Sequence, residues 1–522
     1  MNEDLQNESV QAQNGERYQE ELATESSEEK ATGFYSYQGA APIFLTLLWS
    51  LLLSALSVAN PFLSSFATNL QSQNLYAGWA MAQGQVAYAN IYGTSGLLFY
   101  LAAWAGNLAL GSILLAAFQA LALLFSGLQV YQLTYRLSGQ ASFSSQLVNL
   151  FYLFVLVLGF GGLYAGIFVL PFLFWSLNHL VRYLAGEIKD ERFILYGAVA
   201  AVAFMVEPFS TIIFYGTAFI VFFFYNIAKK RWARGFYQLL GTLLGYSLVF
   251  YPLGYWTVFN GTFGLAISQV LYPLESLGLH HYLLQNGLFY GALFVALGFL
   301  FAIVANLFSS SKAGTASLRA LGILGVLLVF LVAVFQADQG SYQLLPAVPF
   351  VILLFALWFM KEQQRGSHAR HSRLKRKHPS SVWQQYFKGT YFLSVLAGLY
   401  LLGMPLVEPL ILSRQVSAER TEVANYIQEH ADAKDTVYAW DTNASLYQAS
   451  NHLSAASILS PTLYQQTAEN QLGLVNQLQN KPPHYILVNS KVPLTDQMKR
   501  LLESNYKKNS LELKHFTLYR YK

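Results

Sequence analysis

Long apolar runs alternate with short basic turns along most of the chain. Most of these runs approach the roughly 20 residues that a helix needs to cross the hydrocarbon layer of a bilayer. The pattern predicts about eleven transmembrane helices, near residues 41–59, 112–135, 147–161, 166–184, 193–206, 211–228, 236–253, 287–308, 319–337, 343–360 and 390–411. We therefore expect an α-helical polytopic membrane protein.

The basic residues between positions 31 and 411 fall on alternate turns only. With the N-terminus in the cytosol, the cytosolic turns carry all 18 Lys and Arg residues, and the outer loops carry none. This distribution obeys the positive-inside rule. It predicts a bacterial cell-membrane protein whose chain after residue 411 lies outside the cell. The densest cluster, Lys361–Lys377, is interpreted as a topogenic loop, with recognition of anionic lipid or a partner as the alternative.

The two ends of the chain differ from the apolar part. Residues 1–32 hold nine acidic residues against two basic ones, which predicts a disordered cytosolic tail over about 1–40. A membrane domain over 41–411, with a large first outer loop at 60–111, should follow. The last segment, 412–522, predicts a small extracytoplasmic α/β domain. Its expected elements are helix 417–431, strand 435–440, helix 465–479, strand 484–489, helix 494–505 and strand 511–520.

Composition supports the membrane assignment. Charged residues make up 11% of the 522 positions and hydrophobic residues 54%, whereas soluble proteins carry about 25% charged residues. The chain has no cysteine, which excludes disulfides, thiolate nucleophiles and cysteine metal sites. No nucleic-acid partner is expected.

Three stretches carry a resemblance to a known superfamily. They are Tyr76–Tyr100 in the first outer loop, Tyr342 with Pro346 before a late helix, and the tail segments 423–429, 435–440 and 483–489. With this topology the chain resembles the C-type (GT-C) membrane glycosyltransferases. The nearest branch is the bacterial one related to protein O-mannosyltransferases and aminoarabinose transferases (family 39-like). The resemblance implies transfer of a sugar from a polyprenyl-phosphate donor to an extracytoplasmic acceptor, a glycan or an envelope protein.

The first-loop motif departs from the family pattern at the charged positions. The pattern's Pro, two Asp, Lys and final Pro fall on Ala87, Asn90, Gly93, Ser95 and Leu97, and its catalytic Asp falls near Asn69. From Ala31 to Gly186 the chain has no Asp or Glu. Transfer to a hydroxyl needs a base, and an amide cannot accept the proton at neutral pH. The usual catalytic carboxylates are therefore replaced.

Acids elsewhere could substitute. The catalytic candidates are Glu207, beside Pro208 at an outer helix end, and Glu275, ahead of a pair of histidines. Asp338 and Glu408 also lie near the outer surface. A structural role for these groups is the alternative, because residues at the interface can reach water. The candidate substrate-binding residues are Asn69, Tyr76, Tyr88, Asn90, His280 and His281. No spacing predicts a metal site, although an active enzyme could use a divalent metal.

Two functions from different classes remain open. One is a membrane glycosyltransferase of the cell envelope that uses a polyprenyl-phosphate-linked sugar. The other is a catalytically degenerate homologue that binds lipid-linked sugar or glycan as an accessory partner, for example of a co-encoded glycosyltransferase. A transporter or flippase is a third reading, but the broken helices and intramembrane charges that would favour it do not stand out.

Overall fold

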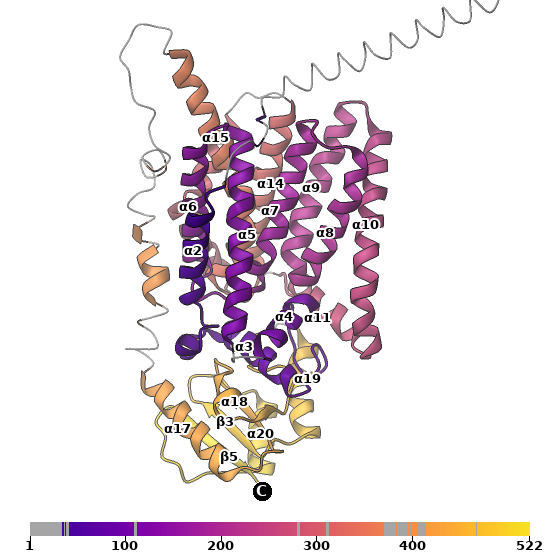
Figure 1. The fold of residues 1–522 in the computed structure, drawn as a ribbon. Helices are drawn as coiled ribbons and strands as arrows, with labels where there is room; N and C mark the ends of the chain where they lie inside the picture. The colour runs from indigo at the N-terminus through magenta and orange to yellow at the C-terminus, as the bar shows by residue number, and fades with distance from the viewer. Residues whose placement is uncertain are drawn as a thin grey trace, which may run out of the picture.

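The computed structural model describes residues 34–35, 37, 41–108, 112–278, 282–308, 313–369, scattered residues between 383 and 407, and 414–522 apart from 466. The predicted acidic tail apart from residues 34, 35 and 37, most of the predicted span 390–411, and residues 370–377 of the basic cluster lie outside these residues. The described chain forms a helical bundle with an α/β unit at one end (Figure 1).

The long helices of the bundle run roughly side by side, and α3, α4 and α11 lie at the end next to the α/β unit (Figure 1). Their bounds are α2 (Ile43–Ala55), α3 (Asn69–Ala82), α4 (Leu97–Asn107), α5 (Ile113–Ser138), α6 (Ala141–Leu158), α7 (Ala165–Leu184), α8 (Phe193–Val206), α9 (Pro208–Ala228), α10 (Trp232–Phe259), α11 (Phe263–Glu275), α12 (Leu283–Ala296), α13 (Phe299–Leu307), α14 (Ala313–Phe335) and α15 (Val348–Ala369). Short 3-10 helices are η1 (Pro61–Phe66), η2 (Asp190–Arg192) and η3 (Ser341–Ala347). We call the end that meets the α/β unit the domain end, and the opposite one the basic end.

Fewer helices than the expected eleven are long and apolar enough to span a membrane. In the described part six meet this criterion, or seven if α12 and α13, which meet at 68°, count as one span. The predicted spans 41–59 and 193–206 form helices of 13 and 14 residues, which are short. The predicted span 236–253 lies in α10, whose Gly, Gln, Tyr and Trp residues dilute its hydropathy. These helices nevertheless lie beside the long ones (Figure 1).

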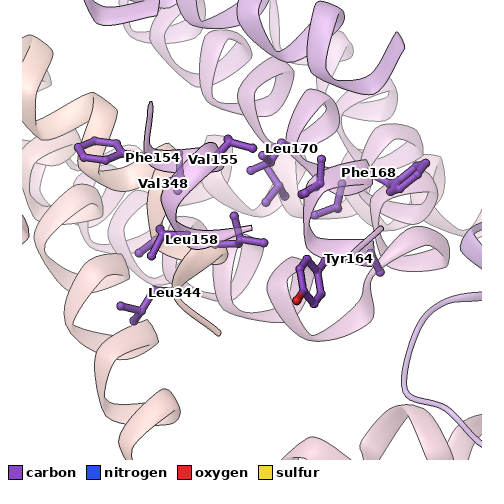
Figure 2. Close-up of a cluster of buried hydrophobic side chains, with 14 of the residues drawn as sticks. Phe154, Val155, Leu158, Tyr164, Phe168, Leu170, Leu344 and Val348 are labelled. Carbon is purple, nitrogen blue, oxygen red and sulfur yellow. The ribbon is translucent and has the colours of Figure 1, made fainter. Parts of the chain in front are cut away.

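The bundle core is apolar and aromatic. Phe154, Val155 and Leu158 of α6 meet Leu170 of α7 and Val348 of α15 in one buried cluster (Figure 2). The cluster joins helices far apart in sequence, so it fixes the positions of the loops at the domain end.

The C-terminal unit is a mixed five-stranded sheet with helices. Strand order is β2-β1-β3-β5-β4, with β1, β2 and β3 parallel and β5 antiparallel to both β3 and β4. Its elements are α17 (Arg414–His430), β1 (Thr436–Trp440), α18 (Ser445–Ala449), β2 (Leu453–Ser454), α19 (Ala468–Asn480), β3 (Tyr485–Asn489), α20 (Asp496–Asn505), β4 (Tyr506–Lys508) and β5 (Phe516–Tyr521). The predicted α/β class is confirmed; α18, β2 and β4 were not predicted.

Candidate active site

A cavity of about 100 Å³ lies at the domain end of the bundle. Its walls come from the first loop, from the turns that precede α7, α9 and η3, from α11, and from the C-terminal unit. The lining includes two carboxylates, Glu207 and Asp338, and four tyrosines: Tyr164, Tyr272, Tyr342 and Tyr464. The fold therefore collects acids and rings from five distant parts of the sequence at one place.

Glu207 occupies the turn between α8 and α9. Its Oε2 accepts a hydrogen bond from the backbone N–H of Ser210, so the side chain caps α9, and Pro208 takes the first helical position. Burial raises the pKa of the Glu207 carboxyl, although the hydrogen bonds from Ser210 and Phe209 oppose the shift. The cap fixes the orientation of a carboxyl group that is a stronger base than an exposed one.

Asp338 follows α14, just before η3. Its backbone oxygen accepts a hydrogen bond from Gln343 Nε2 at 3.4 Å. The carboxylate lies within electrostatic range of Tyr464: burial and Tyr100 raise the pKa of Tyr464 well above its usual value, and Asp338 adds to the shift. A tyrosine held protonated at neutral pH can donate a hydrogen bond to a ligand.

Aromatic rings form one side of the cavity. Tyr164 and Tyr342 stack with ring centroids 4.7 Å apart and planes 12° from parallel (the Tyr164 ring is drawn in Figure 2). Tyr272 and Tyr464 meet edge to face at 5.6 Å. Stacked and edge-on rings of this kind offer flat apolar faces with hydroxyls at their rims.

Among the residues that the structure describes, no Lys, Arg or His lines the cavity. Nor does the described part of the chain hold a group of three or more His, Cys, Asp or Glu side chains suited to a metal ion. A Mg²⁺ ion can nevertheless be held by one or two carboxylates together with water and a substrate phosphate. The described lining therefore combines two acidic side chains, Glu207 and Asp338, with polar and aromatic ones.

Two predicted substrate-binding residues lie beside the cavity, in a docking interface between the first loop and the C-terminal unit. Asn69 Nδ2 donates to Thr462 Oγ1 at 2.8 Å and to Ser460 Oγ at 3.2 Å. Tyr76 Oη accepts from the backbone N–H of Ser454 at 2.9 Å. Neither residue lines the cavity.

Three further hydrogen bonds extend this docking interface by joining α3, or Ala67 two residues before it, to the segment after β1. They are Asn443 Nδ2 to Ala67 O at 2.8 Å, the N–H of Ala444 to Ser72 Oγ at 3.0 Å, and Gln448 Nε2 to Leu75 O at 3.1 Å. The carboxyl ends of the parallel strands β1 and β3, where open α/β sheets commonly bind ligands, face this contact through Asp441 and Asn489.

The remaining predicted residues are dispersed. Tyr88 is buried, and its hydroxyl donates to Ser95 O at 2.9 Å. Asn90 is exposed, and its Oδ1 accepts from the N–H of Val86 in a local turn. Glu275 is exposed at the end of α11 and does not line the cavity. His280, His281 and Glu408 lie outside the described residues.

The sequence analysis named Asp338 as an acid near the outer surface but not among the candidate site residues, and it did not name Tyr464. Between Arg192 and Lys361 the chain has three acidic residues, Glu207, Glu275 and Asp338, and each lies in or next to a turn at the domain end. An acid that is isolated in an apolar sequence is a reason to expect a function. Tyr464 carried no comparable signal, because its part in the cavity depends on domain docking.

Comparison with solved structures identifies the class. The chain is similar to ArnT from Cupriavidus metallidurans bound to undecaprenyl phosphate, with 12% identity and a TM-score of 0.55 over 91% of this chain and 96% of that chain. The apo state of the same protein gives 12% identity and a TM-score of 0.54 over 91% and 97%. The apo oligosaccharyltransferase of Archaeoglobus fulgidus gives 12% identity and a TM-score of 0.49 over 86% and 69%. The likeness to ArnT shows that the chain has the GT-C fold, as the resemblance predicted, and its long apolar helices show a membrane protein.

Family models identify the particular group. The model described as "Putative competence-induced protein Ccs4 N-terminal domain" matches residues 38–413, and the matching C-terminal domain model covers residues 417–522. The chain belongs to this Ccs4 family. No curated protein sequence matches it.

Proposed function

We propose that this protein transfers a sugar from a polyprenyl-phosphate donor to an acceptor hydroxyl outside the membrane. The observation that carries the proposal is the pair of carboxylates, Glu207 and Asp338, in one tyrosine-lined cavity. The first loop lacks the family's acids, and these two groups come from other turns. The undecaprenyl phosphate bound to the structurally similar ArnT supports a polyprenyl donor.

In the proposed reaction Glu207 is the general base. It accepts the proton of the acceptor hydroxyl as that oxygen forms a bond to the anomeric carbon, and the bond from this carbon to the lipid-phosphate oxygen breaks. Burial raises the pKa of Glu207, which strengthens it as a base, and the α9 cap holds its orientation. Asp338 is proposed to accept hydrogen bonds from sugar hydroxyls, with the Tyr164–Tyr342 stack against the ring.

We place this chemistry on the extracytoplasmic side. The N-terminal tail (1–40) would be cytosolic, the membrane domain would span 41–411, and residues 412–522 would lie outside the cell membrane. The 18 basic residues on alternate turns support this topology. Because the chain has no cysteine, single introduced cysteines at Ser445 and Lys189 can be labelled in intact cells with an impermeant maleimide. Labelling of Lys189→Cys but not Ser445→Cys would reverse the topology.

The test of the transfer reaction compares Glu207, which lines the cavity, with Glu275, which does not. Purified protein in lipid nanodiscs would receive a radiolabelled polyprenyl-phosphate hexose and envelope glycan or protein acceptors, with and without a chelator. We expect Glu207→Gln to lower turnover by about 10²–10⁴-fold, the usual contribution of general base catalysis. Glu275→Gln is the matched control, because this glutamate is exposed and outside the cavity lining. Equal activity of both variants would refute the assignment.

A second candidate function is an accessory partner that binds lipid-linked sugar without turning it over. The absence of Lys, Arg and His from the described cavity lining favours it, because a leaving phosphate normally needs cationic stabilisation. Wild-type protein that retains the donor lipid without transferring its sugar to any acceptor would support this candidate. Co-purification with a complete glycosyltransferase would identify the partner.

A further inference from the structure

A second cavity, of about 220 Å³, lies near the basic end of the bundle, among α7, α8, α9 and α10. Its lining is mainly apolar and aromatic, with Phe219, Phe222 and Phe223 supplied by α9. Phe219 and Phe223 are about half exposed, so the cavity opens sideways towards the space that lipid fills around a membrane helix. We call it the α9–α10 slot.

Helix packing explains why the slot exists. α8 and α10 approach until their backbones touch, because a Cβ at Gly197 would collide with Thr242 O and a Cβ at Gly245 would collide with Ile194 O. The large phenylalanines of α9 prevent an equally close approach of α9 to α10. Because α8 and α10 pack closely and α9 stays farther from α10, a gap remains between α9 and α10.

A rigid basic turn closes the slot at one end. Two residues after the end of α9, Lys230 lies in the left-handed region, at φ 56°. Its N–H donates to Ile227 O at 2.9 Å, and the N–H of Arg231 donates to Asn226 O at 2.8 Å. These two hydrogen bonds form a Schellman motif, which fixes the turn. Lys229 and Lys230 are exposed there, three and four residues after the slot-lining Asn226.

Next to this turn, the polar side chains at the end of the slot form one continuous hydrogen-bond network. Gln238 Nε2 donates to Tyr183 Oη at 2.6 Å and to Asp190 Oδ1 at 2.7 Å, and Arg234 Nε donates to Asp190 Oδ2 at 2.8 Å. Asn226 Nδ2 donates to Gln238 Oε1 at 3.2 Å. This network separates the apolar slot from water at the basic end.

One polar group in the slot is not satisfied. Tyr196 lines the slot and is 5% exposed, and its buried hydroxyl has no hydrogen-bond partner among the described residues. Leaving such a donor unpaired in a buried position is unfavourable. It lies three residues after the start of α8, about 5 Å into the helix from the basic end.

We propose that the α9–α10 slot holds one ester-linked chain of an anionic phospholipid, with the headgroup phosphate on the Lys229–Arg231 turn. The tyrosine hydroxyl then donates to the ester carbonyl, which in a phospholipid lies a few ångströms deeper than the phosphate. A polyprenyl phosphate has no ester carbonyl and would leave this hydroxyl unpaired. The site is at the opposite end from the Glu207 cavity and does not depend on the proposed transfer reaction.

The headgroup is tested by native mass spectrometry of delipidated protein titrated with diester phosphatidylglycerol or phosphatidylcholine. We expect preferential binding of phosphatidylglycerol, weakened about tenfold or more by Lys229→Gln/Lys230→Gln, since each cation near an anionic lipid contributes about 1 kcal/mol. Lys507→Gln/Lys508→Gln removes the same charge from the exposed strand β4 and should change nothing. Equal retention of the two lipids, or an equal loss in both variants, would overturn the proposal.

The chain and the ester are tested separately. Tyr196→Phe should weaken diester phosphatidylglycerol about three- to tenfold, the value of one hydrogen bond, and leave its diether analogue unchanged. Ala218→Leu should block the slot, whereas Gly216→Leu adds comparable bulk on the same helix at a position open to its surroundings. Tighter binding of undecaprenyl phosphate than of phosphatidylglycerol, with the same sensitivity to Ala218→Leu, would show that the occupant is a polyprenyl lipid and refute a phospholipid site.

Discussion

The docking interface and the adjacent cavity are built from the same kinds of residue, yet their polar groups are used differently. In the interface the amide of Asn69 is saturated: its Nδ2 donates to Ser460 and Thr462, and its Oδ1 accepts from Gln73 Nε2 at 3.0 Å. In the cavity Gln336 is 6% exposed, and its Oε1 has no hydrogen-bond partner among the described residues. Polar groups paired within the protein hold the two units together, whereas an unpaired buried group next to a cavity is available to a ligand.

The largest effect is expected at Asp441, which follows β1 at the edge of the sheet that faces the docking interface. This carboxylate is fully buried and accepts from Arg420 Nε at 2.8 Å and Asn489 Nδ2 at 2.6 Å. Asp441→Ala leaves the Arg420 charge without its partner, which typically costs about 3–5 kcal/mol. We expect rapid limited proteolysis of the C-terminal unit in the full-length protein. Asp496→Ala, at an exposed position, is the control, and equal protease resistance of the two variants would contradict the assignment.

Asn69→Asp restores the acid of the family pattern and tests whether this position belongs to the docking interface or to a substrate site. Asn69→Asp removes the donor to Ser460 and Thr462 and places a carboxylate in the docking interface. We expect a loss of about 1–3 kcal/mol, seen as a lower thermal midpoint, and no gain in sugar transfer. Asn90→Asp, on the exposed first-loop turn, should change stability by less than about 0.5 kcal/mol. A higher transfer rate in Asn69→Asp would show that this position faces substrate after all.

Gln336→Leu tests the cavity side of the comparison. Removing an amide whose oxygen is already unpaired should leave stability within about 1 kcal/mol of wild type or raise it. Binding of the polyprenyl-phosphate hexose should weaken about tenfold if the ligand uses that oxygen. The measurements are the thermal midpoint and a donor-binding titration. A lower midpoint with unchanged donor binding would assign Gln336 to structure.

The smallest expected effect concerns pH and a contact away from both regions. Burial would raise the pKa of Glu419, but hydrogen bonds from the backbone N–H and ring of His515 outweigh it, so the pKa is lowered on folding. Because this pKa is lower in the folded state, the pair stabilises the fold at pH values above the unfolded-state pKa of about 4.3. This stabilisation is lost as the pH falls through the folded-state pKa. Thermal midpoints at pH 7 and pH 4 should therefore differ less in Glu419→Gln than in wild type. An identical pH dependence in both proteins would show that the Glu419–His515 pair does not contribute to the pH dependence of stability.

Several features of the fold followed from local pattern. In the C-terminal unit the predicted helix 417–431 and strand 484–489 correspond closely to α17 and β3, because amphipathic helices and short β-branched runs carry strong local signals. The two-residue strand β2 was missed, since it forms only by pairing with β1. In the described part six or seven helices, fewer than the eleven predicted, meet the length and apolarity criterion, because several predicted spans form short helices packed among the long ones.

The site illustrates the boundary between sequence and tertiary structure most clearly. The sequence by itself determined the membrane class, the GT-C resemblance, the loss of first-loop acids and the small number of acids left to replace them. Only the tertiary structure brought Glu207 and Asp338 to one cavity, left Glu275 outside it, and paired Asn69 with the C-terminal unit. The physical reason is that apolar periodicity is local, whereas the partner of a polar side chain is set by packing between residues that are hundreds of positions apart.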